Sequence, residues 1–204
     1  MIAIIDYGSG NIAAIANIYK QLKIPYIVTD IPDELHKADR YILPGVGAFD
    51  VTMRHLNDSG MTLMLNDQII RQGKKVLGIC VGMQILAESS EEGELSGLGW
   101  IPGQVRKIDA SLLVKSPKLP HMGWNSITLR DNTRFFEGVD TEYGFYFLHN
   151  YYFDSVDPNN VLATVQHGME MPCAVARANV FGIQFHPEKS HSNGLAVFRN
   201  FAEM

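Results

Sequence analysis

Cys80 stands in the segment Gly78-Ile79-Cys80-Val81-Gly82, a G-x-C-x-G pattern between a β-branched run and a helical one. The same pattern built around serine makes a tight strand-to-helix turn that pushes a nucleophile above a sheet. Its glycines remove the Cβ atoms that would collide with neighbouring backbone. At the start of a helix, the dipole and the free N–H groups favour a thiolate and can hold an oxyanion. The pattern therefore predicts a nucleophilic cysteine, against the alternative of a small thiol buried at a strand end.

His186 stands two residues before Glu188 in FGIQFHPEKS, at the end of an apolar run. In extended backbone, residues i and i+2 face the same side, so the Glu188 carboxylate can reach the imidazole. Pro187 confines His186 to extended conformations. Taken alone, the pair is also typical of a strand end with a solvated acid. Combined with a nucleophilic cysteine, it predicts a Cys-His-Glu triad in which Glu188 orients His186.

The remaining histidines and the second cysteine lie in less suitable contexts. His121 and His149 lie in strand-like aromatic segments and are interpreted as structural. Cys173 is assigned to the core, where free cysteine is often found. Surface or capping roles are expected for the other histidines, which are His36, His55, His167 and His191.

A second glycine-rich turn, ILPGVGAFD at residues 42–50, puts Gly45 and Gly47 directly after another apolar run. Backbone N–H groups in such turns can approach a substrate closely, which suits a second oxyanion donor. The alternative is an ordinary strand-to-helix turn. Neither C-x-x-C nor H-E-x-x-H occurs, so metal catalysis is not expected.

The first turn of the chain raises a competing hypothesis. Gly8, Gly10 and Ala13 in DYGSGNIAA fit G-x-G-x-x-A after an apolar run, and Asp30 lies about 20 residues further on. This spacing is typical of a dinucleotide site. The chain would then be a non-enzymatic, Rossmann-like binding module.

A chain that positions these groups needs strands that end beside one another, and the N-terminal half supplies them. Short β-branched runs alternate there with helical periodicity. Strands are expected at residues 2–6, 26–29, 40–43 and 75–79, and helices at 11–22, at 48–72 with a break near Gly60, and beginning at 83–88. Because the apolar runs do not alternate with polar residues, these strands are expected to be buried on both faces, as in a parallel sheet clad with helices.

From Trp100 onward, strand-like segments follow one another until a helix expected at residues 192–201. Successive strands without intervening helices pair most simply as antiparallel. The sequence therefore predicts an α/β fold with a central, mostly parallel sheet flanked by helices and additional antiparallel strands in the C-terminal half. With 204 residues and no linker-like segment, a single domain spanning residues 1–204 is expected.

Composition excludes several classes of protein. Apolar residues make up 46% of the chain and charged residues 19%, which argues against disorder. A net charge of -5 without a basic cluster argues against a nucleic-acid partner. No apolar run approaches the length that crosses a bilayer. With two cysteines and no leader-like start, a cytoplasmic protein with reduced thiols is expected.

Several segments together match one enzyme family. GICVGMQ with a distant FHPE resembles the class I (triad) glutamine amidotransferases, and DYGSGN, PGVGAF, SEEG, GLGWIPG, LPHMGWN and FHPEKS resemble one branch of that family. The resemblance covers Ile4 to Phe201, nearly the whole chain. It implies the class I glutaminase fold and hydrolysis of glutamine to glutamate and ammonia, without a cofactor or a bound nucleotide.

The resemblance also implies roles for individual residues. Cys80 would attack the carboxamide carbon of glutamine, and His186, oriented by Glu188, would carry the protons. The positions that would hold glutamine or its oxyanion are Gly45, Val46, Gly47, Val81, Gln84, His149, Asn150 and Tyr151. The positions that would face a partner around the ammonia entrance are Asn11, Met122, Trp124 and Lys189.

Two branches of the family share this chemistry and differ in the ammonia acceptor. The first, expected here, forms a heterodimer with a (β/α)8-barrel cyclase or synthase subunit that makes imidazole glycerol phosphate in histidine biosynthesis. The second supplies ammonia for sugar amidination in surface-polysaccharide pathways, and the KSHSNG tail and GLGW are similar to it. Asn150 departs from the family, which more often has Ser or Thr there. Cysteine hydrolysis of another substrate, such as a peptide, ranks last.

Overall fold

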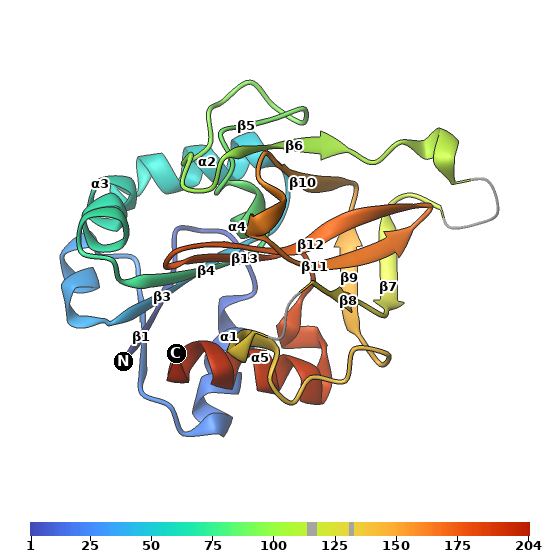
Figure 1. The fold of residues 1–204 in the computed structure, drawn as a ribbon. Coiled ribbons are helices and arrows are strands. Elements are labelled where there is room, and N and C mark those ends of the chain that lie inside the picture. Colours follow the sequence, from blue (N-terminus) through green and yellow to red (C-terminus); the bar gives the residue numbers. More distant parts are fainter. Residues whose placement is uncertain (114–117, 131–132) are drawn as a thin grey trace.

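An eight-stranded sheet runs through the middle of the molecule in the order β2-β1-β3-β4-β13-β12-β11-β8 (Figure 1). The computed structural model describes residues 1–113, 118–130 and 133–204. The strands from β2 to β13 pair in parallel, and those from β13 to β8 pair antiparallel. The expected α/β fold is confirmed. The bounds are β1 Ile2–Ile5, β2 Tyr26–Thr29, β3 Arg40–Gly45, β4 Lys75–Cys80, β8 Thr128–Leu129, β11 Val161–His167, β12 Met169–Arg177 and β13 Val180–Ile183.

Helices cover both faces of this sheet (Figure 1). On one face α1 (Ile12–Leu22) lies beside α5 (His191–Glu203), and on the other lie α2 (Phe49–Asp58) and α3 (Met61–Leu65). The predicted break at Gly60 is confirmed by its φ of 73° between α2 and α3. Among the helices of the described ranges, none is long and apolar enough to span a membrane. Other helical segments are π-helical Asn66–Arg71 and 3-10 segments Pro32–Lys37, Ala110–Leu112, Arg134–Phe136, Pro158–Asn160 and Pro187–Lys189.

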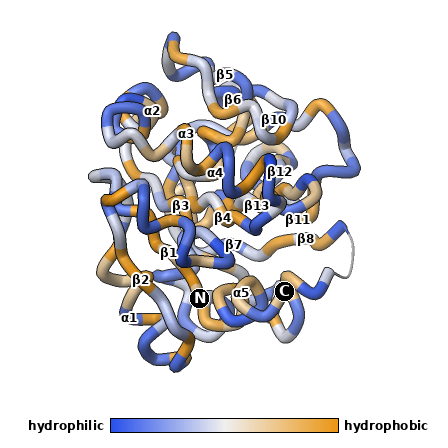
Figure 2. The backbone as a smooth tube through the Cα atoms, turned by 90° about the vertical axis from the view of Figure 1, so that its left-hand side faces the viewer, coloured by the Kyte–Doolittle hydropathy of each residue, from blue (hydrophilic) through white to orange (hydrophobic). Residues whose placement is uncertain are grey.

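The middle strands of the sheet are buried on both faces, as their unbroken apolar runs predict. Every residue of β1 and β13 is buried, and Figure 2 shows hydrophobic colour along β3 and β4 between more hydrophilic loops. In the C-terminal half, aromatic rings fill the core, and the rings of Phe145 and Phe185 stack with their centroids 3.8 Å apart. The parallel pairing of β3 with β4 and of β4 with β13 places their carboxyl ends side by side, and the candidate site residues lie there.

Two smaller sheets flank the main one. The first joins β10 (Tyr151–Ser155), β6 (Gly103–Lys107) and β5 (Ser89–Ser90), and the second is a ribbon of β7 (His121–Asn125) and β9 (Phe145–His149). In the ribbon Met122 pairs with Leu148, while His121 pairs with His149. Because side chains alternate between faces, the ribbon exposes Met122 and Leu148 and buries the two histidines.

The prediction of a helix that begins at residues 83–88 is wrong. Helix α4 spans only Val81–Gln84, and the chain then turns toward β5. Backbone N–H groups from residues 97–101 donate to the carbonyls of residues 85–88. Because a segment further along the chain takes these carbonyls, the helix does not continue through them.

Candidate active site

Cys80 lies at the turn between β4 and α4 in a strained backbone conformation. Its φ is 56° and its ψ is -113°, values that residues other than glycine rarely adopt. A Cβ at Gly78 would lie 2.4 Å from the Gly82 carbonyl oxygen, and a Cβ at Gly82 would lie 1.9 Å from the Leu43 carbonyl oxygen. Only glycine permits backbones to cross this closely. The local geometry is therefore that of the expected elbow.

His186 and Glu188 form a buried pair joined by a short hydrogen bond. His186 Nδ1 lies 2.8 Å from Glu188 Oε1, and the two side chains are 5% and 2% exposed. His186 has extended backbone before Pro187, with φ -101° and ψ 94°. Its carbonyl accepts a hydrogen bond from Ser190 Oγ at 2.6 Å, which holds the residue in place. The i, i+2 spacing thus brings the two side chains together as the sequence predicts.

The surroundings of His186 favour its protonated form. Burial by itself disfavours the imidazolium, but hydrogen bonding to Cys80 and Glu188 and the charges of these two groups outweigh it and raise the pKa of His186 to about 10. The imidazolium is therefore the form present at neutral pH. An imidazolium beside a cysteine is the charge arrangement that activates thiolate nucleophiles.

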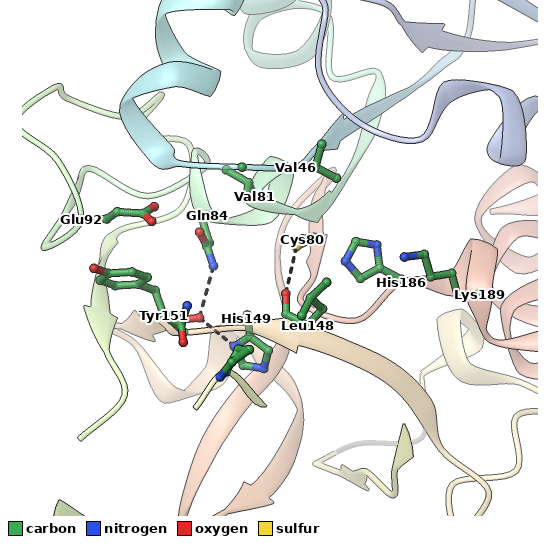
Figure 3. Close-up of a pocket in the computed structure, with 13 residues that line it drawn as sticks. Val46, Cys80, Val81, Gln84, Glu92, Leu148, His149, Tyr151, His186 and Lys189 are labelled. Atoms are coloured by element: carbon green, nitrogen blue, oxygen red, sulfur yellow. Dashed lines mark hydrogen bonds between the residues drawn. The ribbon is translucent and has the colours of Figure 1, made fainter. Parts of the chain in front are cut away.

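A cavity of about 270 Å³ opens beside Cys80 (Figure 3). Cys80 lies between His186 and Lys189 at one end and Gln84, Glu92 and Tyr151 at the other (Figure 3). Of the expected glutamine-binding positions, only Gly45 is outside the lining, and it pairs with Cys80 across β3 and β4. The lining residues are Val46, Gly47, Cys80, Val81, Gln84, Glu92, Pro120, Leu148, His149, Asn150, Tyr151, His186 and Lys189.

Glu92 lines the cavity although the sequence contains no local sign that it would. Its Oε2 accepts a hydrogen bond from the Phe49 N–H at 2.8 Å, at the start of α2. The Asp50 carboxylate in turn accepts the N–H groups of Glu94 and Leu95, at 3.1 Å each. These contacts join segments more than forty residues apart in the chain. SEEG stands out in the sequence only as part of the family resemblance, which does not by itself single out one carboxylate.

The first turn of the chain packs on the second glycine-rich turn. Ser9 Oγ accepts a hydrogen bond from the Val46 N–H at 3.0 Å and donates one to the Val46 carbonyl at 3.1 Å. A Cβ at Gly10 would lie 2.4 Å from Pro44 Cβ, and the Tyr7 hydroxyl donates to the Pro44 carbonyl. The second glycine of DYGSGN, Gly10, is thus explained by close packing on Pro44, and none of these contacts favours a dinucleotide site.

Three histidines cluster behind one wall of the cavity. His121 Nδ1 lies 2.8 Å from His149 Nε2, and the ring centres of His121 and His167 lie 4.1 Å apart. Burial, and then the neighbouring imidazoles, lower the pKa of His121 to about 3. Burial also lowers the pKa of His149 to about 4, despite its hydrogen bond to the Tyr151 carbonyl. The expected structural role of His121 and His149 agrees with this packing.

The expectation that His167 is a surface or capping residue is wrong, because β11 packs its ring against His121 of β7 and leaves it only 8% exposed. His36, His55 and His191 are exposed, as expected. Cys173 is buried and unpaired in β12, and burial raises the pKa of its thiol. Its assignment to the core is confirmed.

The four positions expected to face a partner are all exposed. Met122 and Trp124 are 64% and 41% exposed on β7. Asn11 precedes α1, and its side chain makes no capping hydrogen bond. Lys189 lines the cavity, with its Nζ 5.4 Å from the centre of the Tyr146 ring.

The described part of the chain contains no group of three or more His, Cys, Asp or Glu side chains arranged to hold a metal ion.

Known proteins resemble this chain over its whole length. The model of the family Glutamine amidotransferase class-I matches residues 3–204. Imidazole glycerol phosphate synthase subunit HisH of Bdellovibrio bacteriovorus is 50% identical, and its counterpart in Leptospira borgpetersenii is 45% identical, each over all of both chains. The structure of PurLQS from Thermotoga maritima has a TM-score of 0.68 at 20% identity, covering 99% of this chain and 97% of the matched one. This structural likeness supports the fold.

Proposed function

The chain belongs to the class-I glutamine amidotransferase family, and on that premise we propose that it is the glutaminase subunit of an imidazole glycerol phosphate synthase. It hydrolyses glutamine to glutamate and ammonia, in the cytoplasm and as a single domain. The ammonia passes to a (β/α)8-barrel synthase subunit in histidine biosynthesis. One observation carries the enzymatic part of the proposal: Cys80, on a strained elbow, shares a cavity with a His186 imidazole that is bonded to the buried Glu188 carboxylate.

The reaction begins with the Cys80 thiolate. It attacks the carboxamide carbon of glutamine, and the carbonyl electron pair moves to oxygen to give a tetrahedral oxyanion. As the C–N bond breaks, the His186 imidazolium gives its proton to the leaving nitrogen, which departs as ammonia and leaves a thioester on Cys80. The raised pKa of His186, about 10, supplies the imidazolium that this step needs at neutral pH.

Water completes the cycle. Neutral His186 takes a proton from a water molecule, and the hydroxide adds to the thioester carbon. The bond between that carbon and Cys80 Sγ then breaks, which releases glutamate and regenerates the thiolate–imidazolium pair. Glu188 orients His186 through both steps by its hydrogen bond to Nδ1. The oxyanion lies against the Val81 N–H and an N–H of residues 45–47. Of these, the Val46 N–H is held by Ser9 Oγ in this structure.

The two ends of glutamine find different partners in the cavity. Glu92 brings a carboxylate to the lining and accepts from the substrate ammonium group. The NH2 group of Gln84 donates to the Tyr151 carbonyl and to the side-chain oxygen of Gln184. The side-chain carbonyl oxygen of Gln84 is therefore left for the substrate. The backbone of residues 149–151 borders the same end. Glutamine thus lies with its carboxamide at Cys80 and its charged end toward Glu92.

The exposed ribbon face beside the cavity is the docking surface for the barrel subunit. Leu148 lines the cavity and is 38% exposed, and it pairs with Met122 on β7. Trp124 lies on the same face, stacked against His191 with the ring centres 5.4 Å apart. Ammonia leaves past Lys189 toward this face. The names of the full-length relatives support the histidine branch over the polysaccharide branch.

The test compares Cys80→Ala with Cys173→Ala, which changes the buried cysteine that the mechanism does not use. We expect Cys80→Ala to abolish glutamine-dependent synthesis by the complex while added ammonium salt still supports it. Cys173→Ala should keep both activities. Loss of both activities in folded Cys80→Ala protein would contradict the proposal. Titration with a (β/α)8-barrel subunit should raise glutamine turnover, and no response would favour the polysaccharide branch.

A further inference from the structure

Gln184 is a buried side chain that the mechanism above does not use. It lies directly after β13, two residues before His186, and is 0% exposed. Its Nε2 lies 3.7 Å from Cys80 Sγ, and its Oε1 lies 3.0 Å from Gln84 Nε2. Both ends of the Gln184 amide are therefore hydrogen-bonded, the nitrogen to the nucleophile Cys80 and the oxygen to Gln84.

The orientation of this amide follows from its neighbours. The Tyr151 carbonyl can only accept, and it lies 3.2 Å from Gln84 Nε2 and 2.8 Å from His149 Nδ1 (Figure 3). Gln84 therefore turns its NH2 group toward Tyr151 and uses its second N–H on Gln184. Gln184 must present its oxygen to Gln84, which leaves its NH2 group for Cys80 Sγ.

The same reasoning continues to β7. Because His149 Nδ1 donates to Tyr151, its Nε2 accepts from His121 Nδ1. His121 Nε2 then accepts from Asn125 Nδ2 at 3.1 Å. Both imidazoles are neutral in the folded protein, since burial lowers their pKa values to about 3 and about 4. An ordered series of hydrogen bonds therefore fixes the donor that points at the nucleophile.

We propose that Gln184 is a positioning residue whose NH2 group donates to the Cys80 thiolate and holds Sγ ready for attack on the carboxamide. The contact strengthens when Cys80 ionises, because a hydrogen bond to a charged group is stronger than one between neutral groups. The segment from residue 184 to residue 188 then acts on the nucleophile twice, through the Gln184 amide and through the imidazole that Glu188 orients. The kinetic part of the test rests on the proposed glutaminase function, whereas the alkylation part does not.

Two substitutions separate the two ends of the amide. Gln184→Glu keeps an oxygen for Gln84 but replaces the NH2 donor with a carboxyl group, so the contact with Cys80 is lost and a negative charge is added beside Sγ. Gln184→Met keeps the length of the side chain and removes both contacts. In each variant the rate of Cys80 alkylation by iodoacetamide is measured against pH, with the Cys80 peptide quantified by mass spectrometry. The ionisable groups already beside Cys80, His186 and Tyr7, stay unchanged in both variants, and Gln184→Met adds no charge of its own.

We expect Gln184→Met to alkylate Cys80 about tenfold more slowly at neutral pH, the effect of losing one hydrogen bond to a charged group, and Gln184→Glu to react more slowly still because its carboxylate repels the thiolate. Their profiles should move to higher pH, and kcat for glutamine should fall more than KM rises in Gln184→Glu. The matched control is Gln68→Met, which changes another buried glutamine, one bonded to Tyr41 and Lys74. It should alter thermal stability without changing the alkylation profile.

Alkylation of Gln184→Met, which adds no charge, at the rate and pH dependence of the wild-type protein would overturn the proposal and leave Gln184 with a purely structural role. This outcome is informative even if the protein has no glutaminase activity, so the two proposals can fail separately. A crystal structure of the wild-type protein gives a measurement that does not depend on the folding of a variant. A Gln184 amide whose nitrogen makes no contact with Cys80 Sγ would also overturn the proposal.

Discussion

The hydroxyl of Ser9 binds both the N–H and the carbonyl of Val46, so one side chain from the first turn restrains the loop beside the nucleophile. Val46 is 47% exposed at the rim of the cavity. Because its N–H already has an acceptor, this group cannot bind a substrate oxyanion without leaving Ser9. In the mechanism proposed above, the resting loop therefore withholds one of the N–H groups proposed to bind the oxyanion.

Replacing Ser9 with alanine should therefore raise glutamine turnover of the isolated chain. The gain should reach roughly fivefold, because a hydrogen bond contributes about 1 kcal/mol net. Stimulation by a partner subunit should shrink by a similar factor. The measurement is the initial rate of glutamate formation with and without the barrel subunit. Ser155→Ala, which removes a surface hydrogen bond to the Asp157 carbonyl, is the control, and equal rates for the two variants would contradict this role of Ser9.

Replacing Glu188 with glutamine should move the alkaline limit of activity to lower pH. The Glu188 contact raises the pKa of His186, and the imidazolium is lost as pH rises through about 10. Without the carboxylate this loss begins at lower pH, and kcat should fall by about a hundredfold or more, within the usual range for proton-transfer catalysis. The profile of kcat/KM against pH checks the shift. An unchanged alkaline limb in the variant would show that Glu188 does not act on His186.

Acid should destabilise the protein through His121 and His149. Both are neutral when folded, with pKa values of about 3 and about 4, but take up protons near pH 6.5 when unfolded. Their contribution to stability is therefore present above about pH 6.5 and is lost as pH falls toward 4. His121→Gln should reduce the slope of unfolding free energy against pH by about 1.4 kcal/mol per unit in this window. Urea unfolding at several pH values measures the slope, and the same slope in the variant would contradict the assignment.

Asn11→Ala should leave thermal stability nearly unchanged and weaken activation by the partner. The Asn11 side chain is exposed and makes no capping hydrogen bond to α1, so the substitution removes no cap of the usual kind. Thermal melting and partner titration check the two halves separately. A melting temperature several degrees lower, with normal activation, would assign Asn11 to folding alone.

The sequence by itself determined the features that depend on residues close together in the chain. Cys80 is recognisable because the glycines that its turn requires are its own neighbours, and His186 and Glu188 are recognisable because extended backbone places residues two apart on one face. The parallel strands follow from apolar runs without alternation. Each inference needs only a few consecutive residues, which is why it survives in the folded molecule.

Tertiary structure alone decided the rest. Glu92 reaches the cavity through contacts with α2, His167 is buried by packing of β11 on β7, and α4 ends after Gln84 because distant N–H groups take the next carbonyls. The restraint of Val46 by Ser9 joins residues 37 positions apart, and the contact of Gln184 with Cys80 joins residues 104 positions apart. Such contacts have no periodicity or local pattern, since they depend on which strand ends the folded sheet brings together.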